Sequence, residues 1–349
     1  MSFLSLSNSK TRRTAGIVGP YRYHNFGDDL IGIILAHFLF RAGFHQVAVH
    51  GMLECNAALV GAQVKKIREI VISEDLVVLG GGHILGDGSY EPGSFYQKLI
   101  AVSSVVRTIL RRRTVIAGVG AGPLALRSSR LYASLACKLV SRIGVRDRES
   151  FDFVQQELLR HAGGKLVEGA DVALLWPEVL MPPAREAMRG KVGIQLDPRI
   201  LDWPPWISDL IRDFASSQSS LVYLSNLETP TQAEELLGLP GEHVRYERLE
   251  EFMGELRGCS LLLTSHLHLA IAAYAIGIPT VTLAINHKTP RFYEQIGHPE
   301  RCVLLSEATP EKVRSLIEQA ETASWSEFDQ LRLCHLRQSA QRMLQQVLA

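Results

Sequence analysis

The sequence predicts an α/β protein composed of two doubly wound β/α domains that face each other across a cleft. Three observations lead to this prediction. Short apolar runs alternate with helical patterns along most of the 349 residues, which is typical of parallel sheets with helices on both faces. The alternation stops at a proline-rich stretch over residues 176–190 and then restarts. The chain is also long enough to bury two separate cores.

The first domain is expected over residues 14–183, after a polar tail at residues 1–13. Its apolar runs predict buried strands at Ala15–Val18, Gln46–Val49, Leu76–Leu79, Thr114–Ala117 and Ile143–Val145. Its helical patterns cover Asp28–Arg41, Ser94–Arg113, Ser128–Val140 and Glu149–Arg160. This order of elements indicates a mostly parallel sheet with helices on both of its faces.

The second domain is expected over residues 184–325, followed by a C-terminal helix at residues 326–349. Its predicted strands are Val192–Leu196, Leu221–Ser225 and Val244–Tyr246, and its predicted helices are Trp206–Ser216, Gln232–Leu237 and Leu249–Arg257. Residues 258–287 carry no Asp, Glu, Lys or Arg and are long enough to span a bilayer. Polar residues and the Gly277/Pro279 pair interrupt that run. We therefore interpret it as a buried β–α–β unit whose second strand is Pro279–Ala284.

Composition excludes several functional classes. A formal net charge of +1 does not provide the strongly basic face that a nucleic-acid partner requires. The five cysteines include no CxxC pair and no metal-ligand spacing, so we expect reduced thiols in a cytoplasmic protein. Arg111–Arg113 close a long helical pattern, where cations complement the helix dipole. Attraction to an anionic membrane surface is a weaker alternative for these three charges.

The loop after the first predicted strand, Gly19–Asp29, is a candidate ligand-binding segment. Asn25 suits a tight turn, and Asp28 and Asp29 are placed to cap the following helix. A purely structural turn and cap is as consistent with Asp28 as direct ligand contact. The loop also carries Arg22 and is more polar than a simple connection needs, which favours a binding role.

Two glycine clusters follow later strands of the same domain. The first, GGGHILGDGS over Gly80–Ser89, includes Gly81, Gly82, His83 and Asp87, and the second is GVGAGP over Gly118–Pro123. Glycine lets the backbone approach a ligand closely and exposes successive N–H groups. The first cluster matches neither a P-loop nor a dinucleotide-binding fingerprint, and a tight turn with positive φ is its structural alternative. Two such clusters in one sheet predict a shared binding rim.

Charged residues occupy further junctions between strands and helices. Arg146 follows a predicted strand, where a clamp to Asp147 or Glu149 is the commoner role and a cation facing the cleft is the alternative. Asp171 is likewise either a loop cap or a carboxylate in the cleft. Lys288 follows a strand of the second domain, where a surface lysine and a binding cation are equally consistent with the sequence.

His266 and His268 are the leading candidates for chemistry. They stand at the start of an apolar helix, directly after a buried strand and Ser265. The unpaired N–H groups and positive dipole end of such a helix favour an anion. Two imidazoles beside that anion can donate hydrogen bonds to it or move protons. Histidines at i and i+2 do not face each other on a helix, so we expect no metal pair.

Taken in order, these motifs resemble those of the polysaccharide pyruvyl transferase family. The resemblance rests on NFGDD (Asn25–Asp29), GGGHILGDG (Gly80–Gly88), GVGAGPL (Gly118–Leu124), VRDRES (Val145–Ser150), TSHLHLAIAAYAIGIPT (Thr264–Thr280) and INHKTPRFYEQIG (Ile285–Gly297). Each motif is weak alone, whereas their order over most of the chain is fairly specific.

The resemblance implies two Rossmann-like domains in a glycosyltransferase-B-like arrangement. It also implies pyruvyl transfer from phosphoenolpyruvate to a sugar or lipid-linked oligosaccharide, as a step in exopolysaccharide or other cell-surface glycan synthesis. On this basis the acceptor would bind the first domain and the donor the second. Catalysis is assigned to His268, His266 and Asp28, donor binding to Arg146, Lys288, Ser265, Gly81 and Gly82, and acceptor binding to Arg22, Asn25, Asp87 and His83. The implied location is the cytoplasm, including peripheral contact with the inner face of the membrane, and a homo-oligomer is compatible with the sequence.

One position departs from the family pattern, because His266 stands where the family has an arginine. An arginine is always charged and holds phosphate or carboxylate bidentately, which a histidine does not. The fixed cation would then come from Arg146, Arg22, Arg199 or Lys288. One alternative is a nucleotide-sugar-dependent glycosyltransferase, with Glu228 or Glu250 on the ribose. The other is a non-catalytic sugar-binding relative.

Overall fold

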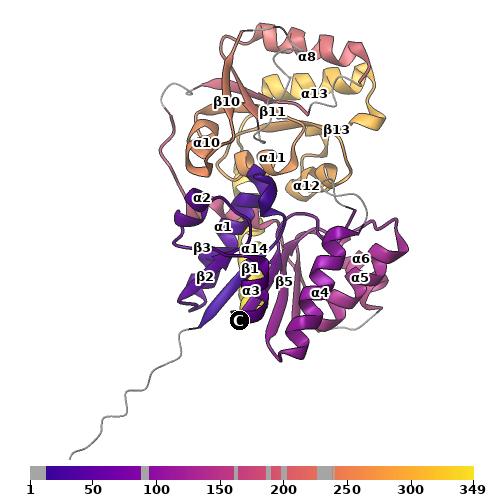
Figure 1. Cartoon of the computed structure of the whole chain (residues 1–349). Coiled ribbons are helices and arrows are strands. Elements are labelled where there is room, and N and C mark those ends of the chain that lie inside the picture. The colour runs from indigo at the N-terminus through magenta and orange to yellow at the C-terminus, as the bar shows by residue number, and fades with distance from the viewer. Residues whose placement is uncertain are drawn as a thin grey trace, which may run out of the picture.

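A computed structural model of the chain describes residues 13–87, 94–160, 164–185, 190–197, 203–225, 238 and 240–349. It contains two parallel sheets, one in each half of the chain, as the alternating pattern predicts (Figure 1). The helix predicted at Gln232–Leu237 lies outside the described residues, as do Arg199 and Glu228.

The first sheet has seven strands in the order β3-β2-β1-β4-β5-β6-β7. They are β1 (Thr14–Val18), β2 (Gln46–Val49), β3 (Gln63–Val64), β4 (Leu76–Gly80), β5 (Arg113–Val119), β6 (Arg142–Val145) and β7 (Leu166–Glu168). Five of these were predicted, with ends that differ by up to two residues. The edge strands β3 and β7 were not predicted, because two or three residues are too few to form an apolar pattern.

The helices of the first domain form a layer on each face of this sheet. They are α1 (Phe26–Arg41), α2 (Glu54–Ala58), α3 (Ile67–Ser73), α4 (Phe95–Ile109), α5 (Arg127–Leu139) and α6 (Arg148–Phe153), with the 3-10 turn η1 (Tyr21–Tyr23) before α1 and the π-helical turn η2 (Val154–Leu159) after α6. The helices α3, α4 and α5, with η2, pack over one hydrophobic core, and α1 packs over the other.

The helix predicted at Ser94–Arg113 is wrong at its C-terminal end. The helix α4 stops at Ile109, and Arg113 is already the first residue of β5. Between them, Arg111 has a positive φ of 53°, and Arg112 donates a hydrogen bond to the Glu74 carbonyl oxygen over 3.1 Å. These arginines therefore form the connection into the next strand rather than the last turn of a helix.

The second sheet has six strands in the order β10-β9-β8-β11-β12-β13. They are β8 (Lys191–Gln195), β9 (Leu221–Ser225), β10 (Glu242–Arg245), β11 (Cys259–Thr264), β12 (Thr280–Ala284) and β13 (Cys302–Leu304). The described helices around it are α8 (Pro205–Ser217), α10 (Leu249–Leu256), α11 (Leu267–Tyr274), α12 (Lys288–Ile296) and α13 (Pro310–Thr322), with short 3-10 turns η6 (Pro299–Arg301) and η7 (Leu305–Glu307).

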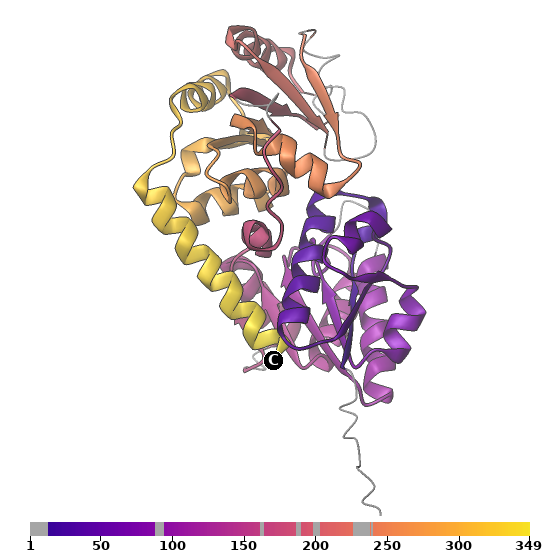
Figure 2. The same cartoon turned by 90° about the vertical axis from the view of Figure 1, so that its left-hand side faces the viewer.

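Two connections cross between the domains. The first contains the 3-10 turn η3 (Val172–Leu175) and the short helix α7 (Trp176–Val179), where the indole N–H of Trp176 donates to the Ala272 carbonyl oxygen over 2.9 Å. The second is the last helix, α14 (Glu327–Leu348), which runs from the second domain down the side of the first (Figure 2). There it packs against β5, β6 and β7.

The helix α11 explains why residues 258–287 carry no Asp, Glu, Lys or Arg. Every residue of this helix is buried, because α1 and η3 of the first domain cover the surface that β11 and β12 leave open. A segment buried on all sides by protein needs apolar side chains just as a segment in lipid does. No helix in the described part of the chain is long and apolar enough to cross a membrane.

Candidate active site between the two domains

The carboxyl ends of strands from both sheets meet at the boundary between the domains. From the first sheet, β4 leads into the glycines before His83, and β6 leads into Arg146. From the second sheet, β11 leads into α11 with His268, and β12 leads into α12 with Lys288. Parallel α/β sheets bind their ligands beyond these ends, so the fold places the candidate residues where a ligand is expected.

Arg146 is the centre of the candidate site and is 5% exposed. Its Nη1 lies 3.2 Å from a carboxylate oxygen of Asp171, and its Nε lies 3.6 Å from one of Asp147. Its Nη1 also lies 3.4 Å from Nε2 of His268, which belongs to the other domain. The structure therefore joins the two roles considered for Arg146, because the clamped arginine also faces the boundary between the domains.

The two aspartates beside Arg146 also fix the local backbone. Asp147 is the N-cap of α6 and accepts a hydrogen bond from the Ser150 N–H over 2.7 Å. Asp171 accepts one from the Ala173 N–H over 2.9 Å with its other oxygen. Burial raises the pKa of Asp171, and the neighbouring guanidinium of Arg146 acts in the opposite direction. Asp171 is thus both a loop cap and a carboxylate of the site.

His268 is held in its neutral form. Burial lowers the pKa of this imidazole well below its usual value, and the positive charges of Arg146 and Lys288 lower it further. Arginine can only donate, so Nε2 of His268 accepts the hydrogen bond from Arg146 and carries a lone pair. The first turn of α1 packs against the same ring, because an ideal Cβ on Gly27 would lie 2.3 Å from Nδ1 of His268. A neutral imidazole can act as a base where its lone pair exchanges this long contact with Arg146 for a substrate proton.

His83 lies beside this cluster rather than on a separate acceptor surface. Its Nε2 donates a hydrogen bond to the Gly122 carbonyl oxygen over 2.7 Å, so Nδ1 carries the lone pair. Among the described residues, that buried Nδ1 has no hydrogen-bond partner. Burial lowers the pKa of His83, and the charges of Lys288 and Arg146 lower it further. An ideal Cβ on Gly120 would lie within 3 Å of both His83 Nδ1 and Arg146 Nη2, so this glycine keeps both groups open.

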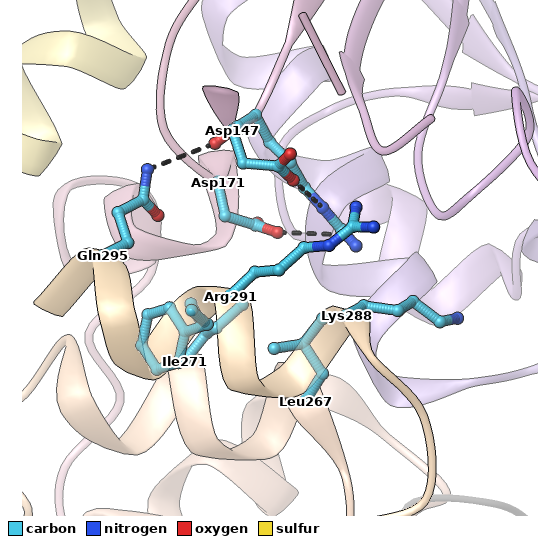
Figure 3. A pocket seen from close by; sticks show the side chains of 9 residues that line it. Asp147, Asp171, Leu267, Ile271, Lys288, Arg291 and Gln295 are labelled. Carbon is cyan, nitrogen blue, oxygen red and sulfur yellow. Dashed lines mark hydrogen bonds and ion pairs between the residues drawn. The ribbon is translucent and has the colours of Figure 1, made fainter. Parts of the chain in front are cut away.

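The second domain adds two cations from the start of α12. Lys288 is the first residue of this helix, and Arg291 follows one turn later. Both line a pocket of about 230 Å³ of empty space, including its open mouth, together with Arg146. In Figure 3, Arg291 and Gln295 reach from α12 toward Asp147 and Asp171.

Arg291 and Gln295 were missed by the analysis of the sequence, although both lie within the quoted motif Ile285–Gly297. The sequence contained the pattern needed to predict them, because Lys288, Arg291 and Gln295 are spaced to share one face of a helix that begins after a buried strand. Arg291 also forms an ion pair with Glu149, and Gln295 donates to the Arg146 carbonyl oxygen over 3.4 Å. These contacts tie α12 to the first domain.

Several predicted site residues have structural roles in the first domain. Asn25, not Asp28 or Asp29, is the N-cap of α1, and its side chain accepts hydrogen bonds from two backbone N–H groups of the first turn. Asp28 is buried against the glycine loop, because a Cβ on Gly82 would lie 2.8 Å from its carboxylate. Gly81 and Gly82 both have positive φ values, of 87° and 61°. These glycines therefore provide the tight turn that was the structural alternative.

The remaining acceptor candidates lie on exposed loops. Arg22 stacks over the rings of Tyr23 and Phe95, with distances of 5.0 and 5.1 Å to the ring centroids. The exposed Asp87 accepts a hydrogen bond from the Ala125 N–H over 2.7 Å and so links the two glycine clusters. The two glycine clusters share one rim, as predicted, but neither cluster lines the pocket beside Arg146.

Ser265 and His266 form the turn between β11 and α11. The Ser265 hydroxyl accepts a hydrogen bond from the Asp197 N–H over 2.7 Å, and the Ser265 N–H donates to the Gln195 carbonyl oxygen over 3.0 Å. His266 is the N-cap residue of α11, and its N–H donates to the Thr264 hydroxyl over 2.9 Å. Ser265 thus ties β11 to the end of β8, while His266 stands next to the catalytic candidate His268. In the described part of the chain, no three His, Cys, Asp or Glu side chains are grouped to hold a metal ion.

A second group of contacts between the domains lies at the other side of α1. The carboxylate of Asp29 accepts hydrogen bonds from the Tyr246 hydroxyl over 2.5 Å and from the Asn56 amide over 3.1 Å. Asn56 in turn accepts one from the Leu249 N–H over 3.0 Å, at the start of α10. Burial raises the pKa of Asp29 to about 7, against the effect of its two donors. The cluster is positioned to hold the domains together rather than to bind substrate.

Comparisons with known proteins agree with this architecture. The chain is similar to the UDP-GlcNAc 2-epimerase from Neisseria meningitidis bound to UDP-GlcNAc, at 12% identity and a TM-score of 0.61, over 96% of this chain and 99% of that one. It is similar to the UDP-GlcNAc 2-epimerase from Methanocaldococcus jannaschii, at 12% identity and a TM-score of 0.61, over 95% and 98% of the two chains. At such identities the likeness shows the fold alone, which is of the glycosyltransferase-B type.

No curated protein sequence matches the chain. The sequence profile described as "Polysaccharide pyruvyl transferase" matches residues 25–287, which include every motif up to the start of α12. This match covers well over half of the 349 residues. The family is therefore established by sequence and the fold by structure, and both are consistent with a transferase. The chain belongs to the polysaccharide pyruvyl transferase family.

Proposed function

We propose that the protein transfers the pyruvyl group of phosphoenolpyruvate to a sugar of a cell-surface glycan precursor. The observation that carries the proposal is the pocket between the domains, which is lined by three cations, one of which contacts the neutral His268. Arg146 comes from the first domain, and Lys288 and Arg291 come from the second. A donor that carries both a phosphate and a carboxylate needs fixed positive charge on more than one side, which this arrangement supplies.

The charge balance of the pocket suits such a donor. Its three cations face two carboxylates, those of Asp147 and Asp171, and both carboxylates lie close to Arg146. Arg146 is therefore largely compensated and Arg291 is paired with Glu149, while Lys288 and Arg291 both reach the pocket from α12. Phosphoenolpyruvate carries roughly two to three negative charges near neutral pH, given a phosphate second pKa of about 6. We assign Lys288 and Arg291 to the donor anion. Arg291 would then supply the fixed cation of the family arginine, whose position is occupied by His266 in this chain.

The reaction converts phosphoenolpyruvate and two sugar hydroxyls into a cyclic ketal and inorganic phosphate. The first hydroxyl oxygen bonds to the carbon that carries the phosphate, while the methylene carbon gains a proton and becomes a methyl group. The second hydroxyl oxygen then bonds to the same carbon as the carbon–oxygen bond to phosphate breaks. One hydroxyl proton thus ends on carbon and the other leaves with the phosphate.

We assign proton transfer to His268. Its neutral imidazole accepts the proton of the first hydroxyl and passes it to the methylene carbon, which returns the ring to its initial form. The adjacent Arg146 opposes a lasting positive charge on the ring, which favours the second half of this transfer. His83, with its lone pair beside the same cations, is positioned to accept a hydrogen bond from an acceptor hydroxyl.

The acceptor is proposed to enter over the first domain. Arg22 and Asp87 are exposed polar groups on the loops that follow its strands, and we assign them to the outer part of a glycan. Asn25 and Asp28 act through the structure of the loop rather than by contact. No cofactor takes part in this scheme, in which phosphoenolpyruvate is a substrate.

Thermal unfolding with and without phosphoenolpyruvate tests the donor assignment. A ligand at one hundred times its dissociation constant should stabilise the protein by about 2.7 kcal/mol. We expect this stabilisation to disappear in Arg291→Ala and to persist in Arg314→Ala, a matched change of an exposed arginine on α13.

Stabilisation by one nucleotide sugar instead of phosphoenolpyruvate would contradict the proposal and indicate a glycosyltransferase. Absence of turnover with every donor, while saccharides still bind His268→Ala normally, would indicate a non-catalytic relative. With an acceptor in hand, release of phosphate should match the gain of one pyruvyl ketal per sugar, measured by mass spectrometry. Loss of this reaction in His268→Ala with donor binding retained would support the assignment of proton transfer.

A further inference from the structure

The positive charge of the chain is unevenly distributed. The formal net charge is only +1, yet residues 92–146 contain ten Lys and Arg and no Asp or Glu. This segment includes the adjacent helices α4 and α5. Two of its arginines are used inside the protein: Arg107 is fully buried and donates to backbone carbonyls, and Arg146 belongs to the site. Most of the others are exposed, and Arg130 lies 3.8 Å from the carboxylate of Glu157 on the neighbouring η2, so α4 and α5 present cations without acidic residues of their own.

Large apolar side chains are exposed on the same two helices. On α4, the exposed apolar residues Phe95, Val102 and Ile109 are seven residues apart, which places them along one face. Ile109 is 75% exposed. On α5, Leu131 is 68% exposed, and Leu135 follows it one turn later. Single exposed leucines are ordinary, but repeated ones along adjacent helices form a surface that water disfavours.

Basic residues are interleaved with these apolar residues. Lys98 is exposed between Phe95 and Val102 on α4. Arg127 and Lys138 are exposed at opposite ends of α5, and both are spaced to share a helix face with Leu131. The surface made by Phe95, Lys98, Val102, Ile109, Arg127, Leu131, Leu135 and Lys138 is called the α4–α5 face. Figure 1 labels the two helices that carry it.

We propose that the α4–α5 face docks this protein on an anionic phospholipid membrane. Apolar side chains that enter the acyl boundary and cations that attract lipid phosphates are the two components of a peripheral membrane surface. The positive charge of the α4–α5 face distinguishes between a membrane and a second copy of this chain as its binding partner. A second copy of this chain docked by the same face would bring cation against cation, because α4 and α5 carry no acidic residue. An acidic lipid surface complements the face instead.

The position of the face fits the site. The α4–α5 face begins at Phe95, whose ring is 5.1 Å from the guanidinium of Arg22 on the loop before α1. Both α4 and α5 start at the strand ends that deliver the two glycine clusters. If the acceptor is lipid-linked, which rests on the proposed function, docking here holds the membrane beside the acceptor side of the site.

Flotation of the full-length protein with lipid vesicles tests the proposal without donor or acceptor. Wild-type protein should float with vesicles of phosphatidylcholine and phosphatidylglycerol at low salt, and much less with phosphatidylcholine alone or at high salt. Leu131→Glu should abolish most of this binding. The matched control is Leu331→Glu on α14, because Leu331 is 66% exposed on another surface and should tolerate the change.

A charge-reversal pair tests the basic component. Arg127→Glu with Lys138→Glu should weaken binding to anionic vesicles by at least about fivefold for each cation removed. The same change in net charge, made at the exposed Lys312 and Arg314 of α13, should leave most of the binding intact. This comparison separates a local surface from the overall charge of the protein.

Three results would overturn the proposal. The first is wild-type protein that does not bind anionic vesicles, and the second is Leu331→Glu weakening binding as much as Leu131→Glu does. The third is a dimer, seen by light scattering, that Leu131→Glu converts to a monomer, which would assign the face to a second copy. None of these readouts involves phosphoenolpyruvate, so failure here leaves the proposed transfer unaffected, and failure of that transfer leaves docking unaffected.

Discussion

Asp29 offers a sharp test of the contact between the domains. This carboxylate is fully buried in α1 and receives hydrogen bonds from Tyr246 of the second domain and from Asn56. Its other oxygen is buried without a hydrogen-bond partner among the described residues. Replacing it by asparagine removes the charge, keeps an oxygen for both donors and places an amide NH₂ where the unpartnered oxygen was.

The magnitude follows from the pKa. Burial raises the pKa of Asp29 from 3.8 to about 7, so folding favours its protonated form. The corresponding stability is present below pH 3.8 and is lost as the pH rises to about 7, beyond which it stays constant. At 1.36 kcal/mol per pKa unit, this amounts to about 4 kcal/mol over the whole range, of which about 2–3 kcal/mol falls between pH 5 and pH 8.

Asp29→Asn does not titrate, and its unsatisfied amide should cost about 1–3 kcal/mol at every pH. The stability of the variant relative to wild type should therefore rise by about 2–3 kcal/mol between pH 5 and pH 8, and the variant should be the more stable protein at pH 8. Urea unfolding of both proteins at several pH values measures this difference, because titrations elsewhere in the chain cancel. A stability difference that is the same at pH 5 and pH 8 would refute the reasoning. Tyr246→Phe should shift the transition to higher pH, since it removes one donor to the carboxylate.

Three further predictions concern the site. Asp171→Asn removes the anion from a buried ion pair and should lower the free energy of unfolding by about 3 kcal/mol in urea. Gly82→Ala should lower the free energy of unfolding more than Gly61→Ala does. Both glycines have positive φ, but only a Cβ at Gly82 would meet a side chain, that of Asp28. Equal losses in the two variants would contradict this close approach of Asp28 to the backbone of Gly82. The pKa of His268 is lowered in the folded protein, so its contribution to stability is present above pH 6.5 and is lost as the pH falls. In thermal unfolding scans, His268→Gln should therefore show a smaller decrease in stability toward acid pH than wild type does.

The candidate site takes its residues from both domains. His268 and the cations of α12 belong to one domain, whereas Arg146 and His83 belong to the other. The second domain thus carries the proposed base and two cations, and the first domain adds a third cation in contact with that base. The contacts of Asp29 and the crossing of α14 hold the halves together, so changes at either position should affect donor binding without touching the donor.

Much of the fold could be predicted from the sequence. The alternation of apolar runs and helical patterns gave the central strands of both sheets, because a strand covered on both faces must be apolar throughout. Leu221–Ser225 and Gln46–Val49 were predicted to the residue. The pattern failed where burial is partial or elements are short, as for β3 and β7, and at α4, where three arginines continued a helical pattern into a turn.

The sequence by itself also determined the family and the residue types of the site, since ordered motifs at strand ends need no coordinates to be found. Only the tertiary structure decided which of those residues meet. It joined Arg146 to His268, which are 122 residues apart, placed His83 near Lys288 and Arg146, and added Arg291. It also gave structural roles to Asn25, as the N-cap of α1, and to Gly82, in a turn with positive φ. The reason is physical: spacing along a chain sets which side chains share an element, whereas contacts between elements depend on how two sheets pack.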